Sequence, residues 1–192
     1  IHNGCLNVLN PTILREYDIR GVVGDTLLEV DAYHIARAFG SELIDKGGRS
    51  AVVGYDGRKS SPMLESAVVR GLVECGVTVF RIGLGPTPML YYGVFELNAD
   101  SGMMITGSHN PPGYNGIKMT MLGKSFFGSD IQNLGLRLRE KRFVQGEGKT
   151  IIQPIIEKYL ARLLHDYEGK RSLRVGWDPG NGATGEVLKR IV

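Results

Sequence analysis

The sequence predicts an α/β fold: a mixed, largely parallel sheet sandwiched between helices, followed by an incomplete second α/β unit. The chain has 192 residues, enough for one domain and part of another. Hydrophobic residues make up 42% and charged residues 22%, which is the balance of a globular protein and not of a disordered chain. Strand-like and helix-like segments alternate, which is typical of crossover units in a sheet covered on both faces. Functional residues are therefore expected in the loops that follow the carboxyl ends of strands.

The first elements are predicted from composition and from the spacing of apolar residues. Residues 13–23 (ILREYDIRGVV) have the composition of a strand. Residues 30–46 carry apolar side chains at near-helical spacing until Gly47 and Gly48 end the pattern. Residues 51–55 (AVVGY) form a short apolar run that is typical of a buried strand. This order predicts a strand, a helix and a second strand.

The next helix is predicted to begin with Ser61 as its cap and Pro62 in its first position, where proline is favoured. Its apolar residues recur at helical spacing and form one stripe: Leu64, Ala67, Val68, Gly71, Leu72 and Cys75. Cys75 is therefore interpreted as a core residue and not as a reactive thiol.

Further strands and a helix are predicted up to residue 122. Residues 77–82 (VTVFRI) predict a strand, and Thr87 with Pro88 predicts the start of a helix. Residues 101–106 (SGMMIT) and 117–122 (IKMTML) predict two more strands. The loop between these last two strands begins at a strand's carboxyl end, where chemistry is expected.

A change of composition predicts a domain boundary near residue 150. It divides an N-terminal domain, residues 1–150, from the beginning of a second α/β domain, residues 151–192. The elements predicted for the second unit are a helix over 156–167, a strand over 173–177, a loop over 178–182 and a helix over 185–192. Because this unit holds only one strand, we expect the remainder of the second domain to be absent from the chain.

The charge of the chain does not mark a nucleic-acid-binding protein. The formal net charge is only +3, whereas such domains concentrate many cations on one face. The densest basic run contains Arg137, Arg139, Lys141 and Arg142, and it is interpreted as a solvated helix end. No nucleic-acid partner is therefore expected.

Cysteine content and hydropathy predict the compartment. Two cysteines, Cys5 and Cys75, are too few for a metal site or a disulfide framework, so a reduced, cytoplasmic protein is expected. No apolar run approaches the roughly 18 residues that a membrane span needs, so no membrane partner is expected.

The loop over residues 106–116 (TGSHNPPGYNG) is the first candidate for chemistry. It places Ser108 directly after Gly107 and beside the imidazole of His109. Gly107 permits unusual backbone torsions, and amides in such a turn can bind an anion. A serine presented in this way is placed to accept a phosphoryl group. On composition alone, the same residues are more typical of an ordinary turn.

A glycine pattern near the end of the chain supports a competing hypothesis. Residues 180–185 (GNGATG) have the spacing of the dinucleotide-binding fingerprint, between a predicted strand and a predicted helix. The confirming acidic residue, about 20 positions further on, would lie past Val192. Spacing excludes the P-loop at Lys124 and Lys149, because the first glycine is missing in both places.

Several motifs together resemble those of the α-D-phosphohexomutases. Residues 106–111 (TGSHNP) with 115–118 (NGIK) resemble the active-serine signature, and residues 16–21 (EYDIRG) resemble the N-terminal motif. Residues 56–62 (DGRKSSP) are a third match, and 178–182 (DPGNG) are similar to the first strand-end loop of the second domain. The active-serine motif is most similar to that of the bacterial phosphomannomutase/phosphoglucomutase branch. The resemblance covers about residues 13–192, which corresponds to the first of four domains and the beginning of the second.

This resemblance implies an enzyme that interconverts hexose 1-phosphates and hexose 6-phosphates. It implies that Ser108 is the phosphoserine carrier, with His109, Lys118 and Arg20 as the other catalytic residues. It also implies that Tyr17, Arg20 and Lys118 bind the substrate, and that a sugar bisphosphate is the intermediate and activator. The expected partners are a phosphosugar and the remainder of the same enzyme.

The resemblance further implies one Mg²⁺ ion in the intact enzyme. The family holds it with an Asp-rich loop of the form D-G-D-x-D, which does not occur in this sequence. Ser108 would contribute a ligand through its phosphate, and oxygen is the ligand atom that Mg²⁺ prefers. The family's sugar-recognition loop and its C-terminal phosphate-binding loop are also absent, so the chain alone is expected to be inactive. The alternatives are a dinucleotide-binding protein that uses residues 180–185 and a noncatalytic interaction domain of similar fold.

Overall fold

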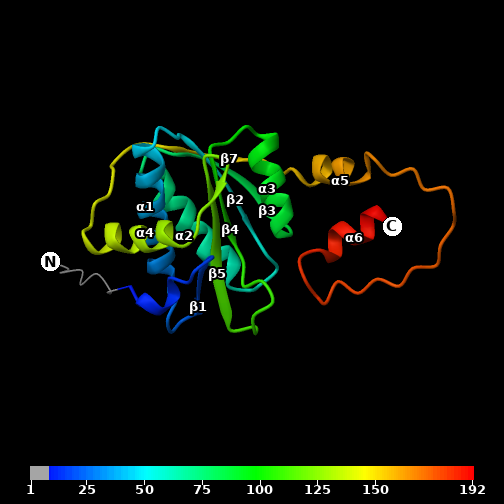
Figure 1. Ribbon diagram of the computed structural model, residues 1–192, viewed down its shortest axis with the longest axis horizontal. Coiled ribbons are helices and arrows are strands. Elements are labelled where there is room, and N and C mark those ends of the chain that lie inside the picture. Colours follow the sequence, from blue (N-terminus) through cyan, green and yellow to red (C-terminus); the bar gives the residue numbers. More distant parts are fainter. Residues whose placement is uncertain (1–8) are drawn as a thin grey trace.

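The computed structural model describes residues 9–192 and is built around one mixed sheet with helices on both faces (Figure 1). Cys5 lies outside the described residues. The strands are β1 (Ile19–Val22), β2 (Ser50–Tyr55), β3 (Thr78–Leu84), β4 (Ser101–Ile105), β5 (Tyr114–Met121), β6 (Lys124–Ser125) and β7 (Lys149–Ile152). The helices are the short 3₁₀-helix Pro11–Ile13, α1 (Glu29–Asp45), α2 (Ser61–Val73), α3 (Thr87–Glu96), α4 (Ser129–Arg139), α5 (Ile156–Leu164) and α6 (Gly185–Ile191).

The strand order confirms the predicted mixed sheet. The path is β1-β5-β4-β2-β3-β7, with β6 paired to β5. Strands β4, β2, β3 and β7 run parallel, because helices connect most of them, whereas β5 is antiparallel to β4, β1 and β6. The carboxyl ends of β2, β3 and β4 therefore meet at one edge of the sheet.

The core divides into two clusters because alternate residues of a strand face opposite sides of the sheet. In β2, Ala51 and Val53 belong to the cluster covered by α1, α2 and α4, whereas Val52 belongs to the cluster on the side of α3. Cys75 is buried in the first cluster, as predicted. Its Sγ donates to the backbone carbonyl of Arg37 at 3.2 Å.

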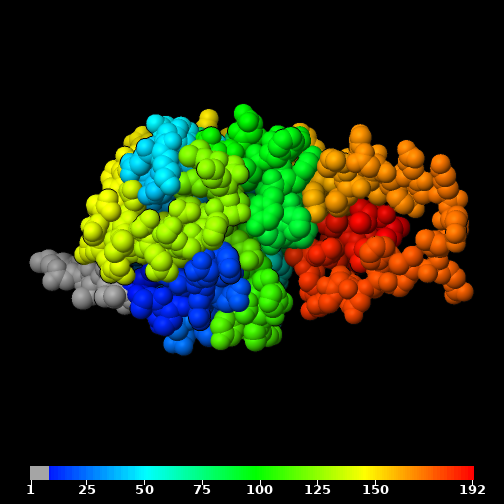
Figure 2. Space-filling view, in the orientation of Figure 1, coloured from blue at the N-terminus to red at the C-terminus, as the bar shows by residue number. Residues whose placement is uncertain are grey.

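The second cluster continues from α3 into α5 and α6. Tyr159 and Leu160 of α5 and Val187 of α6 are buried there, with Met89 and Leu90 of α3. An ion pair of 2.6 Å between Arg190 and Glu157 also joins α6 to α5. Figure 2 shows both helices, and the segment between them, at one side of the molecule. No helix within residues 9–192 has the length and apolar character needed to cross a membrane.

Two predicted strands differ from the structure. Within residues 13–23, only Ile19–Val22 forms a strand, because a turn between Leu14 and Ile19 interrupts the segment. Residues 173–177 form no strand, so that prediction is wrong. Leu173, Val175 and Trp177 are exposed, and no strand of the described residues pairs with them. Apolar composition alone does not make a strand without a neighbouring strand to bond.

The predicted solvated helix end is wrong for one of its four basic residues. Arg139 is exposed, but Arg137, two positions earlier on α4, is buried. Its Nη2 donates to Glu42 Oε2 at 3.1 Å and to Asp45 Oδ2 at 2.7 Å. Arg137 therefore fastens α4 to the end of α1, which is a structural role.

The sheet extends past residue 150. Strand β7 was not predicted, and it pairs with β3 from Thr78↔Lys149 to Arg81↔Ile152. Ile155, just beyond it, is buried against α3 in the second cluster. The chain from 149 to 155 is therefore part of the same packed unit as β3 and α3.

Candidate active site

Ser108 lies in the loop after β4, at the carboxyl end of that strand. Its backbone φ is 52°, in the left-handed region that residues other than glycine seldom adopt. The residue is exposed, and its Oγ lies 3.2 Å from Nδ1 of His109. The Ser108 amide donates to Thr106 Oγ1 at 2.8 Å. The hydroxyl is thus presented to the surface with an imidazole as its hydrogen-bonding partner.

The expectation that Gly107 supplies the unusual torsion is wrong, because Ser108 itself adopts it. The φ of Gly107 is not in the left-handed region, so its backbone conformation suits other residues. A Cβ added to Gly107 would instead collide with the side chain of Arg58. Glycine is therefore needed at 107 for space and not for torsion.

The structure brings the two predicted cations together through a carboxylate. Arg20 in β1 and Lys118 in β5 lie on adjacent antiparallel strands. The buried Asp18 accepts from both through Oδ2, at 2.9 Å from Arg20 Nη2 and 3.2 Å from Lys118 Nζ. Arg20 Nη1 also lies 3.5 Å from Asn110 Oδ1 in the Ser108 loop. Sequence reasoning assigned Asp18 no role, although it stands two residues before Arg20 in the same motif.

Tyr17 is close to this cation group but is separated from Ser108. Its side chain is exposed and stacks on Phe127, with ring centroids 6.2 Å apart. It lines a cavity of about 550 Å³ with Arg20 and Asn110, and Ser108 does not line that cavity. The structure therefore gives Tyr17 a place beside Arg20.

Ser108 and His109 line a larger cavity, of about 1070 Å³. Asn110 lines this cavity as well as the smaller one, so the two adjoin at that residue. Residues of three strand-end loops contribute to its wall: 56–60 after β2, 85–88 after β3 and 106–113 after β4. The segment 180–184 also lines it. The site thus lies where the fold class places it, beyond the carboxyl ends of parallel strands.

The segment 180–184 does not have the context of a dinucleotide fingerprint. That motif needs a strand directly before its first glycine, and residues 173–177 form none. Gly180 and Asn181 are both left-handed, with φ of 58° and 59°, and the Gly180 amide donates to Asp178 Oδ1 at 2.9 Å. The glycines therefore form a turn that closes on Asp178.

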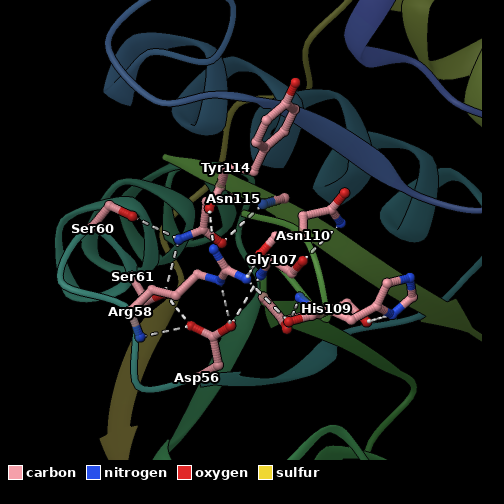
Figure 3. Close-up of polar contacts among 12 residues, drawn as sticks. Asp56, Arg58, Ser60, Ser61, Gly107, His109, Asn110, Tyr114 and Asn115 are labelled. Carbon is pink, nitrogen blue, oxygen red and sulfur yellow. Dashed lines mark hydrogen bonds and ion pairs between the residues drawn. The ribbon is translucent and has the colours of Figure 1, made fainter. Parts of the chain in front are cut away.

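Sequence reasoning also missed the role of residues 56–61. The Asp56 carboxylate accepts from the amide of Arg58 at 3.0 Å, from Ser61 Oγ at 2.6 Å and from the amide of Gly107 at 3.0 Å (Figure 3). Ser61 is the first residue of α2 and not its cap, which is Ser60, and its hydroxyl donates to Asp56. The sequence marked this segment only through its resemblance to a family motif, and that resemblance did not show which residues it contacts.

The described residues contain little that could hold a metal ion. Within residues 9–192, no group of three or more His, Cys, Asp or Glu side chains is placed to do so. Asp18 and Asp56 are already bonded to cations or amides. A phosphorylated Ser108 would offer exposed oxygen atoms, which are suitable ligands for Mg²⁺. The residues present thus fit one contribution to a metal site and not a whole one.

Comparisons with known proteins agree on one family. Residues 11–143 match the family model described as phosphoglucomutase/phosphomannomutase, alpha/beta/alpha domain I. The chain is 41% identical over 184 residues to the phosphomannomutase/phosphoglucomutase of Pseudomonas aeruginosa, covering 96% of this chain and 40% of that protein. It is 39% identical over 184 residues to the phosphoglucomutase of Neisseria gonorrhoeae, covering 93% of this chain and 39% of that protein.

A solved structure supports the same relationship. A phosphoglucomutase/phosphomannomutase family protein from Burkholderia thailandensis superposes with a TM-score of 0.91 at 39% identity. The match covers 95% of this chain and 42% of that one. The chain therefore spans about two fifths of the length of these relatives.

Proposed function

The chain belongs to the phosphoglucomutase/phosphomannomutase family, and on this premise we propose that it is the N-terminal part of a hexose phosphate mutase. The enzyme interconverts hexose 1-phosphate and hexose 6-phosphate, with mannose, glucose or both as the sugar. The names of the relatives support both sugars. The observation that carries the proposal is the exposed, left-handed Ser108 at a strand end beside His109, in a loop whose Asn110 lies against Arg20 of the cation pair joined by Asp18.

Ser108 is the phosphoryl carrier in this proposal. In the first step the bond from phosphorus to Ser108 Oγ breaks and a bond from phosphorus to a sugar hydroxyl oxygen forms, which gives a hexose bisphosphate. The bisphosphate turns around, and its other phosphoryl group returns to Ser108 Oγ, which leaves the isomeric monophosphate. Exposure of Ser108 to the larger cavity supports this role. In each transfer the sugar oxygen and Ser108 Oγ must lie on opposite sides of phosphorus, and the cavity leaves one side open to the sugar.

Arg20, Lys118 and His109 supply charge and proton handling in the proposal. Phosphoryl transfer depends mainly on positioning and on neutralising the charge of the transferring group. Arg20 and Lys118 are only partly buried and share one carboxylate, so their remaining donors can meet phosphate oxygens. His109 Nδ1, at 3.2 Å from Ser108 Oγ, is within reach to orient the reacting groups or to accept the proton of the sugar hydroxyl. Tyr17, beside Arg20, contacts the substrate.

We also propose that the intact enzyme uses one Mg²⁺ ion and a sugar bisphosphate. The phosphate on Ser108 is the contribution of this chain, and the other metal ligands lie outside it. Bound Mg²⁺ neutralises negative charge on the transferring phosphoryl group. The 192 residues alone are therefore expected to have no turnover.

The proposal also extends to the domain organisation, the partners and the location of the protein. We propose that residues 1–150 are the domain that carries the phosphoserine loop and that residues 151–192 begin a second α/β domain. Strand β7 crosses this boundary. The partners are a phosphosugar and the rest of the same enzyme, with no nucleic acid and no membrane. A cytoplasmic location is proposed because two cysteines are too few for a disulfide framework.

The test is Ser108→Ala in the full-length enzyme. Loss of the covalent carrier should remove nearly all turnover of hexose phosphates, while wild-type enzyme treated with a hexose bisphosphate should carry one phosphate on Ser108. Intact-mass measurement and peptide mapping locate the phosphate. Ser125→Ala, at an exposed serine outside both cavities, is the control and should retain activity. A phosphate found on another serine, with Ser108→Ala still active, would contradict the proposal.

A further inference from the structure

Arg58 uses its guanidinium group entirely on the backbone of the Ser108 loop and on Asp56. Nη1 donates to the carbonyls of Pro111 at 2.7 Å and Tyr114 at 2.9 Å. Nη2 donates to the carbonyls of Ser108 at 3.1 Å and Asn110 at 2.6 Å. Figure 3 shows the side chain of Arg58 between Asp56 and the residues of this loop.

The remaining donor of Arg58, Nε, faces Asp56. It lies 3.4 Å from Asp56 Oδ2 in an ion pair. A guanidinium group has five N–H donors, and the four on Nη1 and Nη2 are bonded to carbonyls of the loop. Arg58 therefore has no free Nη donor for a substrate phosphate, although it lines the same cavity as Ser108.

Asp56 holds the start of the loop while Arg58 holds its carbonyls. The Asp56 carboxylate accepts from the Gly107 amide, and Ser61 Oγ donates to the same carboxylate. The loop after β4 is thus joined to the end of β2 and to the first residue of α2. These links connect segments about fifty residues apart in the chain, so they depend on the folded sheet.

Asn115 fastens the far end of the loop to the same place. Its Nδ2 lies 2.9 Å from Ser60 Oγ and 2.9 Å from Ser61 Oγ, and its Oδ1 accepts from the Gly116 amide at 2.8 Å. Both ends of the loop are therefore anchored at the start of α2. Arg58 fills the space between the anchors.

Gly107 and Arg58 are matched to each other. The atoms nearest to a Cβ added at Gly107 all belong to the Arg58 side chain. Because the φ of Gly107 is not left-handed, a side chain there is excluded by close contact and not by torsion, and the closest contacts are those with Arg58.

We infer that Arg58 is a positioning residue that holds the Ser108 loop in the conformation needed for phosphoryl transfer. The inference rests on the proposed function of Ser108. Ser108 adopts a backbone conformation that serine disfavours, so contacts from its surroundings must maintain it. The reaction in turn is sensitive to small displacements of Oγ, because a misplacement of about 1 Å can cost a hundredfold in rate.

Arg58→Lys in the full-length enzyme is the first test, because lysine keeps the charge but cannot span four carbonyls. We expect kcat to fall about tenfold to a hundredfold with KM for the hexose phosphate little changed, since the Nη donors of Arg58 are bonded to the loop and not to substrate. Hydrogen exchange at the Gly107 and Ser108 amides should become faster. Arg70→Lys is the matched control: Arg70 is exposed and pairs with Glu29, and its replacement should change neither measurement.

A double-mutant cycle is the second test. Gly107→Ala should lower kcat in the wild-type background, because the added Cβ displaces Arg58. In an Arg58→Ala background the same substitution should cost much less, because the collision is gone. Equal losses of kcat in both backgrounds would contradict the claim that Arg58 is what excludes a side chain at Gly107. This test also applies if Arg58→Lys unfolds the loop.

The outcomes distinguish this inference from the proposed function. Wild-type enzyme without mutase activity would contradict the proposed function, whereas hydrogen exchange would still report whether Arg58 holds the loop. Active wild-type enzyme with unchanged kcat and unchanged exchange in Arg58→Lys would overturn the inference and leave the proposed function intact. Lower kcat with normal exchange at Gly107 and Ser108 would also overturn it, because Arg58 would then act in another way.

Discussion

The two ends of the β2 and β4 pair are fastened by the same arrangement. At the amino ends, Asp100 accepts from the amides of Arg49 at 2.8 Å and Ser50 at 3.0 Å, and from Ser50 Oγ at 2.9 Å. At the carboxyl ends, Asp56 accepts from two amides and one serine hydroxyl in the same way. One carboxylate therefore joins the neighbouring chain segments at each end of the pair.

The difference between the ends is the reach of the neighbouring arginine. Arg49 donates to carbonyls of Ile44 and Gly48, which are within five residues of it. Arg58 donates to carbonyls 50 to 56 residues away, in the loop that carries Ser108. At the amino ends one aspartate is enough to join the two strands. At the carboxyl ends the loop with the left-handed Ser108 is held in addition by the hydrogen bonds of Arg58 to its carbonyls.

The largest effect on turnover is expected for the two cations of the candidate site, Arg20 and Lys118, which lie toward the Ser108 loop. Arg20→Ala and Lys118→Met in the full-length enzyme should each lower turnover about 10²-fold to 10³-fold, because donors to the transferring group are lost. Steady-state kinetics measures the effect, and melting temperature checks that the fold is retained. Arg139→Ala, at an exposed cation on α4, is the control. If Arg139→Ala were as harmful as Lys118→Met, the site would not be localised at this end.

A smaller effect on turnover is expected for the carboxylate itself. Asp56→Asn removes the ion pair to Arg58 and one acceptor for the loop, so kcat should fall about tenfold to a hundredfold. Asp100→Asn makes the same chemical change at the other end and should leave kcat unchanged. The comparison would fail if kinetics showed the two variants to be equally impaired.

The smallest effect concerns stability and its pH dependence. Burial raises the pKa of Asp100, but hydrogen bonds from Arg49 and Ser50 outweigh this and hold the pKa below its ordinary value. Asp100→Asn should therefore lower the stability of the β2 and β4 pairing by about 1 kcal/mol at neutral pH. Hydrogen exchange of the β2 and β4 amides reports the free energy of local opening.

The sign of the pH dependence follows from the lowered pKa. The ionised Asp100 stabilises the folded chain above the ordinary carboxyl pKa of about 3.9, and this stabilisation is lost as the pH falls through the lower folded-state value. The stability difference between wild type and Asp100→Asn should therefore shrink in acid. A difference that stayed constant down to acidic pH would show that the charge of Asp100 does not contribute.

Much of the fold could be predicted from the sequence because it depends on local patterns, whereas Arg20, Lys118 and Tyr17 were proposed as site residues through the resemblance of their motifs to a family. Apolar spacing indicates α1 and α2, and turn-rich motifs indicate the loop with Ser108 and His109. Strand β7 was missed, and a strand was wrongly predicted over 173–177, because strand formation depends on a distant partner.

The contacts among site residues could not be predicted for the same reason. Asp18 joins Arg20 to Lys118 across 100 positions of the chain, and the bonds from Arg58 to the Ser108 loop span 50 to 56 positions. Arg137 and Arg139 have the same charge and lie two residues apart, yet one is buried and the other exposed. A single sequence shows which side chains exist at such positions, but packing decides what each one contacts.

The left-handed backbone of Ser108 has a consequence for attempts to improve this enzyme by selection. Glycine or asparagine suits that conformation better than serine, by about 1 kcal/mol. A screen that rewards heat resistance alone would therefore favour replacement of Ser108 and would discard its hydroxyl. Stability and activity are opposed at this one position, so a library for thermostability should keep residue 108 constant.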